Sequence, residues 1–343
     1  MKRILITGGA GFIGKSLVRR LLLSPENIIF NIDKLNYASY SKPIKDFCSE
    51  SNNKNYKLFE IDLANNLKIY EAVKQANPDI VFHLAAESHV DRSISNPCDF
   101  IQSNIIGTYN LLAASLEFYR NLNQERQKKF KFIHVSTDEV FGTLGSNGHF
   151  SEDSRYNPRS PYSASKASSD HLVKAWYHTY SLPIIISNCS NNYGPWQFPE
   201  KLIPKIIYNG LKSKEIPIYG NGSNIRDWLF VEDHVDALIS LSKLGETGES
   251  YCIGGNEEKS NNEVVNHICQ ILDKEFPKNR PHIKLINYVE DRPGHDHRYS
   301  IDFSKIKTKC GWEPKYSFSE GLSKTVDWFI KNIHWMEKVQ KKY

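Results

Sequence analysis

A cluster of four glycines between an apolar run and a helical pattern constrains this chain more than any other feature. Residues 7–14 read TGGAGFIG, which fits both G-x-G-x-x-G (Gly9, Gly11, Gly14) and a tighter spacing at Gly8, Gly11 and Gly14. Such glycines let the backbone turn sharply and approach a diphosphate, which then lies on free N–H groups at a helix N-terminus. The pattern therefore predicts a dinucleotide site after the first strand of a parallel α/β sheet.

An acidic residue at the end of the second apolar run supports this reading. Asp33 follows the glycines by about twenty residues, where its carboxylate would accept hydrogen bonds from a ribose diol and repel a 2′-phosphate. This favours NAD over NADP as the cofactor. Asp62 closes the third run, and Leu84, Ala85 and Ala86 close the fourth with small side chains. Ligands in doubly wound sheets lie at the carboxyl ends of strands, so both positions suit the cofactor.

Short apolar runs follow one another along the chain with helical patterns between them. Within each run, apolar residues do not alternate with polar ones, as they would in a strand covered on one face only. Strands are expected at residues 3–7, 28–32, 56–61, 80–84, 132–135 and 184–188. Helices are expected at 15–23, 67–75, 100–119 and 161–180, and the segment 33–56 is expected to be mostly loop. We therefore predict an α/β fold with a Rossmann-type doubly wound parallel sheet.

The elements after residue 191 are shorter and predict a smaller C-terminal α/β substrate domain. Strands are expected at 216–219, 227–231, 249–253 and 283–286, and helices at 199–212, 235–244, 262–274 and 319–332. The predicted division is an NAD-binding domain over residues 1–190 and a second domain over 191–343. The segment of about 226–252 is expected to return to the first domain.

Composition narrows the class of protein further. The 343 residues carry a formal net charge of +5, with 40% hydrophobic and 24% charged residues, which is ordinary globular composition. The sequence has no stripe of basic residues of the kind that binds nucleic acid. No apolar run reaches the ~18 residues of a membrane helix. Six cysteines without C-x-x-C spacing predict buried small side chains in a reducing compartment, and no metal site. We expect a cytoplasmic protein with neither nucleic-acid nor membrane partners.

A reactive pair is predicted at the start of the helix over 161–180. Tyr162 and Lys166 stand at i and i+4 and so share one helix face. A free phenol has a pKa of ~10, and a nearby ammonium and a nicotinamide cation both favour phenolate. Lowering that pKa by ~3 units takes ~4 kcal/mol and would make Tyr162 a general base for a sugar hydroxyl. Y-x-x-x-K is common by chance, but it becomes specific with the nucleotide fold and the preceding Ser136-Thr137.

Five longer motifs carry a family resemblance over nearly the whole chain. They are HLAAESHVDRS (83–93), VSTDEV (135–140), NCSNNYGP (188–195), RDWL (226–229) and DRPGHD (291–296). With the glycine motif and the Tyr162/Lys166 pair, these resemble the extended short-chain dehydrogenase/reductases acting on nucleotide sugars, and within them the dTDP-glucose 4,6-dehydratases. The resemblance implies NAD-dependent dehydration of dTDP-glucose to dTDP-4-keto-6-deoxyglucose, a hydro-lyase reaction in deoxysugar biosynthesis.

The resemblance also implies catalytic roles. Asp138 would be the acid for the C6 hydroxyl, Glu139 the base at C5, and Thr137 would hydrogen-bond the C4 oxygen beside Tyr162. Elimination needs two carboxyl groups whose pKa values are held apart. Consecutive side chains on a strand point to opposite faces, so both acids can reach one sugar only beyond the regular end of the strand.

Binding residues follow from the same resemblance. On the cofactor side they are Gly8, Gly11, Phe12, Ile13, Gly14, Asp33, Lys34, Asp62, Leu63, Leu84, Ala85, Ala86, Ser103, Tyr162, Lys166 and Asn192. On the substrate side they are Ser88, Thr137, Asn191, Lys201, Leu202, Pro217, Ile218, Tyr219, Arg226, Asn261, Arg292 and His295. Arg226 and Arg292 are the natural cations for a diphosphate. Phe141 and Ser103 depart from the tyrosine and threonine common in the family, and the changed order at Asn256-Glu257 weakens the assignment of Asn261.

Three alternatives remain at this point. Nothing in the residues decides thymine against uracil, so a UDP-glucose 4,6-dehydratase stays open. A nucleotide-sugar 4-epimerase is disfavoured by Asp138-Glu139, and a non-catalytic NAD-binding scaffold is disfavoured because every reactive residue is present. The superfamily often dimerises through helices like those near 100–119 and 161–180, so we expect a homodimer by analogy.

Overall fold

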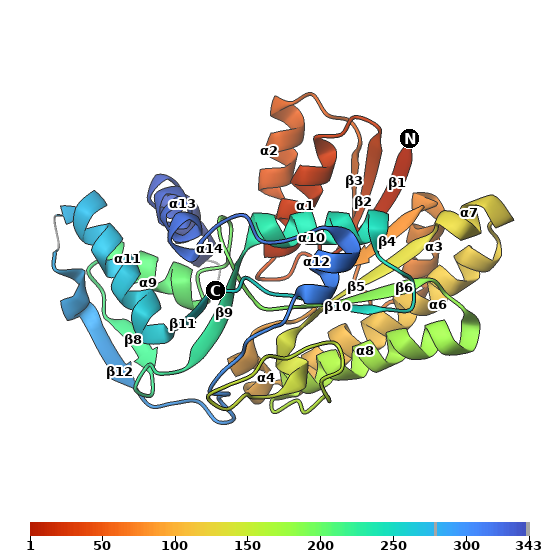
Figure 1. Cartoon of the computed structure of the whole chain (residues 1–343). Coiled ribbons are helices and arrows are strands. Elements are labelled where there is room, and N and C mark those ends of the chain that lie inside the picture. The colour runs from red at the N-terminus through yellow and green to blue at the C-terminus, as the bar shows by residue number, and fades with distance from the viewer. Residues whose placement is uncertain (278–279, 341–343) are drawn as a thin grey trace.

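A seven-stranded sheet forms the centre of the computed structural model, which describes residues 1–277 and 280–340 (Figure 1). Its strand order is β10-β6-β5-β4-β1-β2-β3, and every pair in it is parallel. The strands are β1 (Lys2–Thr7), β2 (Asn27–Asp33), β3 (Tyr56–Glu60), β4 (Ile80–His83), β5 (Lys131–Thr137), β6 (Ile184–Cys189) and β10 (Ser250–Ile253). The predicted Rossmann-type fold is therefore confirmed.

Helices cover both faces of this sheet, which explains why its strands are apolar without alternation. Along β1, Ile4 and Ile6 enter one hydrophobic core and Leu5 enters the other. The first core is closed by α1 (Phe12–Leu22), α2 (Lys42–Glu50), α10 (Val231–Leu244) and α12 (Ser304–Cys310). The second is closed by α3 (Asn66–Ala76), α6 (Gly107–Arg120) and α8 (Pro161–Tyr180).

The strand order reverses direction beside β1, and this reversal creates the site. From β1 the chain builds outward through β2 and β3, and then returns to β4 on the other side of β1. Crossover helices on either side of this point leave the sheet in opposite directions, so a crevice opens at the carboxyl ends of β1 and β4. The glycine cluster and the segment 84–86 both lie at that edge.

The second half of the chain adds two small sheets around a third hydrophobic core. β7 (Asn191–Tyr193), β9 (Ile225–Phe230) and β11 (Glu258–Ser260) form one, and β8 (Ile216–Tyr219) with β12 (Ile286–Val289) form the other. The helices here are α9 (Leu202–Leu211), α11 (Asn261–Glu275), α13 (Phe318–Lys331) and α14 (Ile333–Gln340). Residues 278–279 and 341–343 of the predicted second domain lie outside the described residues.

Three expectations about local structure were wrong. The segment 33–56 contains α2, an amphipathic helix that begins at a Lys-Pro pair and buries Ile44. The helix expected at 100–119 is present, as a continuous run of α5 (Pro97–Phe100), a π-helix (Ile101–Ile106) and α6. The strand expected at 283–286 is a 3₁₀ turn (His282–Leu285), and β12 starts only at Ile286 because pairing with β8 sets its register. Cys98 is exposed rather than buried.

Two surface helices complete the set, α4 (Val90–Ser95) and α7 (Gln124–Lys129). Within the described residues, no helix is both long and apolar enough to cross a bilayer.

Candidate active site

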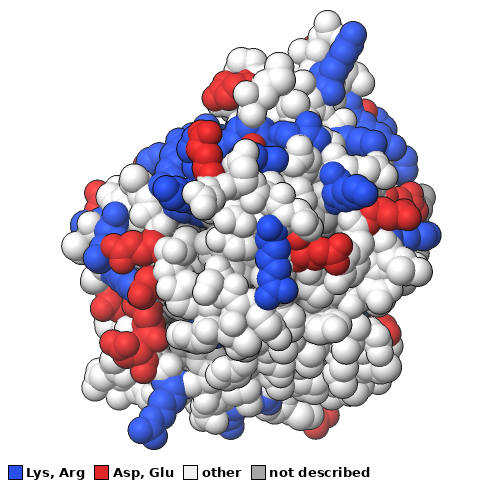
Figure 2. All heavy atoms as spheres, turned by 90° about the vertical axis from the view of Figure 1, so that its right-hand side faces the viewer, with Lys and Arg blue, Asp and Glu red and all other residues white. Residues whose placement is uncertain are grey.

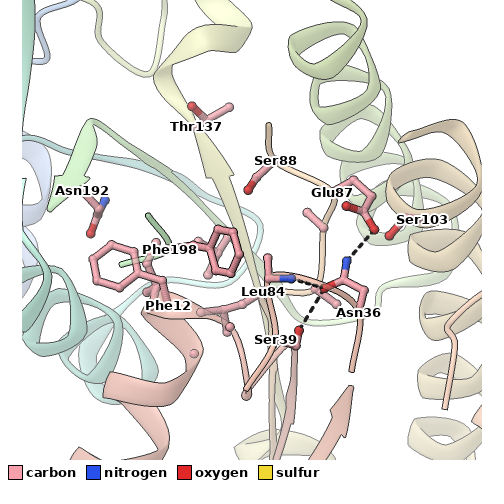
Figure 3. A pocket seen from close by; sticks show the side chains of 18 of the residues that line it. Phe12, Asn36, Ser39, Leu84, Glu87, Ser88, Ser103, Thr137, Asn192 and Phe198 are labelled. Atoms are coloured by element: carbon pink, nitrogen blue, oxygen red, sulfur yellow. Dashed lines mark hydrogen bonds between the residues drawn. The ribbon is translucent and has the colours of Figure 1, made fainter. Parts of the chain in front are cut away.

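A pocket occupies the crevice at the carboxyl ends of the central strands, and all sixteen predicted cofactor residues line it (Figure 3). The five predicted catalytic residues, Thr137, Asp138, Glu139, Tyr162 and Lys166, line the same pocket. They come from the end of β5, the 3₁₀ turn that follows it and α8, while the glycines come from the loop after β1 and the first turn of α1. The fold thus places a nucleotide cradle and a set of reactive side chains in one cavity.

The glycine loop is shaped for close approach of backbone to backbone. Gly8 has φ +73, and a Cβ there would lie 2.7 Å from the Cα of Ala85. A Cβ on Gly14 would lie 2.2 Å from the carbonyl oxygen of Gly8. Gly11 is the N-cap of α1 and provides no side-chain cap, so the first N–H groups of the helix remain available to a diphosphate. These features fit a dinucleotide.

Substitution of Gly14 tests this geometry. Gly14→Ala is expected to destabilise the fold by about 1–3 kcal/mol, because the new methyl group must displace the backbone of Gly8. We also expect NAD affinity to fall at least about tenfold as the diphosphate N–H groups move out of line. Calorimetric titration with NAD measures this, and Gly145→Ala is the control, because a Cβ there would meet nothing within 4 Å and the backbone is not left-handed. Unchanged NAD affinity in Gly14→Ala would contradict the assignment.

Asp33 is buried beside the glycine loop. Its Oδ2 accepts a hydrogen bond from the backbone N–H of Ala10 at 2.9 Å, and its Oδ1 accepts one from Leu35 at 2.9 Å. Burial raises the pKa of Asp33, and these backbone donors oppose that rise. A carboxylate has about four lone-pair sites, so acceptor capacity remains for a ribose diol.

Sequence reasoning missed one wall of the pocket. Lys34 forms a 2.8 Å ion pair with Glu87, and Asn36 also donates to Glu87 at 2.8 Å (Figure 3). Across the pocket, Tyr37 donates to Glu200 at 3.0 Å. The missed residues include Asn36, Tyr37, Ala38, Ser39, Glu87, Gln197, Phe198 and Glu200. The loop after β2 could have been found, because it leaves the carboxyl end of a strand beside the glycines.

The two candidate acids, Asp138 and Glu139, both lie just after the end of β5. β5 ends at Thr137, and a 3₁₀ turn begins at Asp138 and runs to Phe141. The alternation of side chains between the two faces of the sheet therefore ends before Asp138. Both acidic side chains reach the pocket, as the two-acid mechanism requires. The Thr137 hydroxyl caps this turn by accepting from the backbone N–H of Glu139 at 3.2 Å, and it donates to Asp138 Oδ1 at 3.2 Å.

The surroundings of these two acids differ in charge. Burial raises the pKa of Asp138 well above its ordinary value, and the neighbouring carboxylates Glu139 and Asp227 raise it further. Burial also raises the pKa of Glu139, but Arg292, Arg226 and Lys201 oppose that rise. Asp138 is thereby favoured as the protonated partner and Glu139 as the carboxylate, which is the separation an acid and a base need.

Tyr162 and Lys166 lie one turn apart near the start of α8, and both are buried. The Lys166 ammonium donates to the carbonyl oxygen of Val135 at 2.9 Å. Burial and the charge of Glu139 raise the pKa of Tyr162 well above its ordinary value. The predicted lowering of this pKa invoked a nicotinamide cation together with the Lys166 ammonium, and it stays a prediction.

The predicted substrate residues fall into two groups. Ser88, Thr137, Asn191 and Lys201 line the pocket. The other eight, Leu202, Pro217, Ile218, Tyr219, Arg226, Asn261, Arg292 and His295, are outside its lining. Two of these meet at Asp91, which accepts from Arg292 at 3.1 Å and from Tyr219 at 3.1 Å.

Two substrate-side residues have restricted side chains. Ile218 is fully buried in the third core, so only its backbone is available to a ligand. Arg226 is also buried and donates to the carbonyl oxygens of Ile225, Asp296 and His297. Its Nε and one Nη hydrogen remain for a phosphate, which leaves one edge of the guanidinium rather than the whole group.

Comparison with known proteins places these features in a family. A family model described as GDP-mannose 4,6 dehydratase matches residues 5–325. The dTDP-glucose 4,6-dehydratase of Shigella flexneri is 49% identical over 347 residues, covering 98% of this chain and 95% of that protein. The crystal structure of the dTDP-glucose 4,6-dehydratase of Bacillus anthracis in complex with NAD superposes with a TM-score of 0.86 at 40% identity, covering 99% of this chain and 100% of that one. The enzyme of the same name from Streptomyces venezuelae, with NAD and a ligand designated TYD bound, gives 0.88 at 36%, covering 98% and 99%.

Proposed function

This chain belongs to the dTDP-glucose 4,6-dehydratase family, and on that premise we propose that it converts dTDP-glucose to dTDP-4-keto-6-deoxyglucose as an NAD-dependent hydro-lyase. The observation that carries the proposal is the meeting of Asp138, Glu139, Tyr162 and Lys166 in a pocket that also contains the glycine cradle. An epimerase has no use for a paired acid and base beside the tyrosine. The substrate pocket and the cofactor cradle are continuous, as direct transfer between them requires.

NAD, when bound, would accept a hydride from C4 during oxidation and return it to C6 in the later reduction. The uncapped N-terminus of α1 would hold its diphosphate, and Asp33 would accept hydrogen bonds from its adenine ribose. Lys166 and Tyr162 line the same pocket, where they would meet the reacting sugar. A bound nicotinamide cation would favour the Tyr162 phenolate together with the Lys166 ammonium.

Oxidation at C4 requires a base for the C4 hydroxyl proton. Tyr162 takes this proton, and Thr137 hydrogen-bonds the developing C4 carbonyl oxygen. The resulting carbonyl makes the C5 proton acidic. Glu139, whose carboxylate is favoured by three neighbouring cations, removes that proton.

Elimination then completes the dehydration. Asp138, kept protonated by burial and by adjacent carboxylates, donates its proton to the C6 hydroxyl, which leaves as water. The C5–C6 double bond that forms is reduced at C6, and a proton returns to C5. Glu139 returns to C5 the proton that it removed, which restores the base. Asp138 has given one proton to the leaving water and Tyr162 has gained one from the C4 hydroxyl. Thr137 hydrogen-bonds both side chains and can relay this proton from Tyr162 to Asp138, which restores the acid for the next turnover.

We also propose how the molecule is organised around this site. The NAD-binding domain covers residues 1–190 and the nucleotide-sugar domain covers 191–343. Within the segment of about 226–252, α10 and β10 belong with the first domain, because α10 packs in its core and β10 extends its sheet, whereas β9 pairs in a small sheet of the second. A cytoplasmic homodimer pairing through α6 and α8 accounts for exposed Ile101, Ile106 and Tyr109. Figure 2 shows a broad uncharged area in the lower part of one face, at the level of α6 and α8 in Figure 1. A monomeric mass in light scattering would exclude the dimer.

Mass spectrometry of reactions run separately with dTDP-glucose and UDP-glucose, without added NAD, tests the function. We expect loss of one water from dTDP-glucose, with retained NAD sufficient for turnover. Water loss from UDP-glucose alone would keep the mechanism and overturn the nucleotide. If neither sugar loses water after NAD is supplied, the proposed reaction is wrong.

A further inference from the structure

Asp170 is a fully buried carboxylate that the reaction steps above do not use. It follows Lys166 by one turn of α8, and it does not line the pocket. Its Oδ2 accepts hydrogen bonds from Ser136 Oγ at 2.8 Å, Tyr156 OH at 2.9 Å and Asn188 Nδ2 at 3.3 Å. Burying a carboxylate costs much free energy unless it is paired. A carboxylate held in the interior by three hydrogen bonds therefore suggests a role beyond packing.

His134 connects this carboxylate to the catalytic lysine. Its Nε2 lies 3.1 Å from Asp170 Oδ1 and 3.5 Å from Lys166 Nζ. An ammonium can only donate, so Nε2 accepts from Lys166, and Asp170 Oδ1 has no hydrogen-bond partner among the described residues. Burial by itself would raise the pKa of Asp170, but the contacts with His134, Lys166 and Ser136 outweigh it and hold that pKa below its ordinary value. Asp170 is therefore ionised.

Every other titratable group that faces Lys166 among the described residues is neutral near pH 7. Burial lowers the pKa of His134 on β5 to about 4 and that of His83 on β4 well below its ordinary value. Burial raises the pKa of Cys189 on β6 to about 12, and that of Tyr162 is raised as well. Burial also lowers the pKa of Lys166 itself, and Asp170 is the largest opposing influence.

We propose that Asp170 is a positioning residue for Lys166, the buried counter-charge that keeps this amine an ammonium while it faces the pocket. The proposal rests on the proposed role of Lys166 beside Tyr162. A neutral amine would neither stabilise a Tyr162 phenolate nor hold the cofactor as a cation does. The carboxylate lies behind the lysine, away from the pocket lining, where it supports the charge without meeting the substrate.

Asp170→Asn tests the charge with little change of shape. The amide oxygen can take over the Oδ2 contacts, and the amide N–H can face His134, whose neutral ring accepts at Nε2. We expect the basic limb of the pH profile of kcat/KM for dTDP-glucose to move down by about one pH unit or more, because a buried lysine without its counter-charge loses its proton earlier. The same downward shift is expected in the pH dependence of NAD affinity, followed by tryptophan fluorescence.

Tyr156→Phe is the matched control, since it removes one donor from Asp170 and keeps the carboxylate. It is expected to leave both profiles in place, whereas an equal shift in Tyr156→Phe would reduce Asp170 to a packing role and overturn the proposal. Profiles of Asp170→Asn that coincide with the wild type would overturn it too. If Asp170→Asn does not fold, Asp170→Glu replaces it. This variant keeps the charge and is expected to keep the wild-type basic limb, and a lowered limb there would contradict the proposal.

The NAD titration separates this inference from the proposed function because it needs no sugar. A wild-type protein that leaves dTDP-glucose intact would overturn the dehydratase assignment. A shifted NAD profile in Asp170→Asn would still support the counter-charge in that case, and an unshifted one would refute it.

Discussion

Glu139→Gln is expected to stop dehydration while dTDP-glucose still reduces the bound cofactor. Oxidation at C4 depends on Tyr162 and Lys166, which this change leaves in place, but no base remains to remove the C5 proton. General-base catalysis contributes about 10²–10⁴-fold, and we expect turnover to fall by that amount. Rapid-mixing absorbance in the band of reduced nicotinamide should show accumulation in the variant, and mass spectrometry should show intact sugar mass apart from the two hydrogens lost.

Asp138→Asn is the companion variant and should slow the same elimination by removing the proton donor for the C6 hydroxyl. Both variants are expected to fold and to retain NAD, because neither side chain contributes to the hydrophobic cores. Glu152→Gln is the control, since Glu152 is a half-buried carboxyl outside the pocket lining. It should dehydrate dTDP-glucose at the wild-type rate. Wild-type turnover in both Asp138→Asn and Glu139→Gln would contradict the assignment of Asp138 as the acid and Glu139 as the base.

Tyr162→Phe is expected to block the reaction one step earlier. Without the phenol oxygen no group at this position accepts the C4 hydroxyl proton, so cofactor reduction and dehydration should both fall by about 10²–10⁴-fold. The ring itself packs edge-on against Phe100 at 6.3 Å between centroids, and phenylalanine keeps that contact. Stability should therefore change little, and thermal unfolding checks this.

The contrast between the variants is the sharpest test of the mechanism. Glu139→Gln should accumulate reduced cofactor, and Tyr162→Phe should not. Tyr156→Phe is a control on a second tyrosine near the start of α8, outside the pocket lining, and it should react normally near neutral pH. Cofactor reduction at the wild-type rate in Tyr162→Phe would show that another group is the base.

Local patterns were sufficient to predict the parallel sheet and the glycine cradle. Apolar runs without alternation predict strands covered on both faces, and Ile4, Leu5 and Ile6 indeed serve two cores. The spacing of glycines after a strand predicts a cradle, and Gly14 has no room for a side chain. The adjacency of Asp138 and Glu139 required both acids to lie beyond the regular end of the strand, and β5 ends at Thr137, two residues after the expected end.

The predictions from sequence were wrong where the hydrophobic pattern was weak or where the pairing of one strand with another set the bounds of an element. α2 lies in a polar segment whose packing on the core rests on a few apolar side chains, chiefly Ile44. The start of β12 is decided by its partner β8 rather than by its own residues, two of which are exposed. Edge strands that face solvent carry little pattern of their own.

The sequence by itself determined the parallel sheet and the cradle, because each depends on neighbours within a few positions. The reactive residues were predicted from the Y-x-x-x-K spacing and from a family resemblance. Only the tertiary structure decided which charges surround them. It brought Arg226 and Arg292 to Glu139, committed most of the Arg226 guanidinium to backbone carbonyls, and placed Asp170 behind Lys166. Protonation depends on burial and on charges carried by distant segments, and neither is encoded in local spacing.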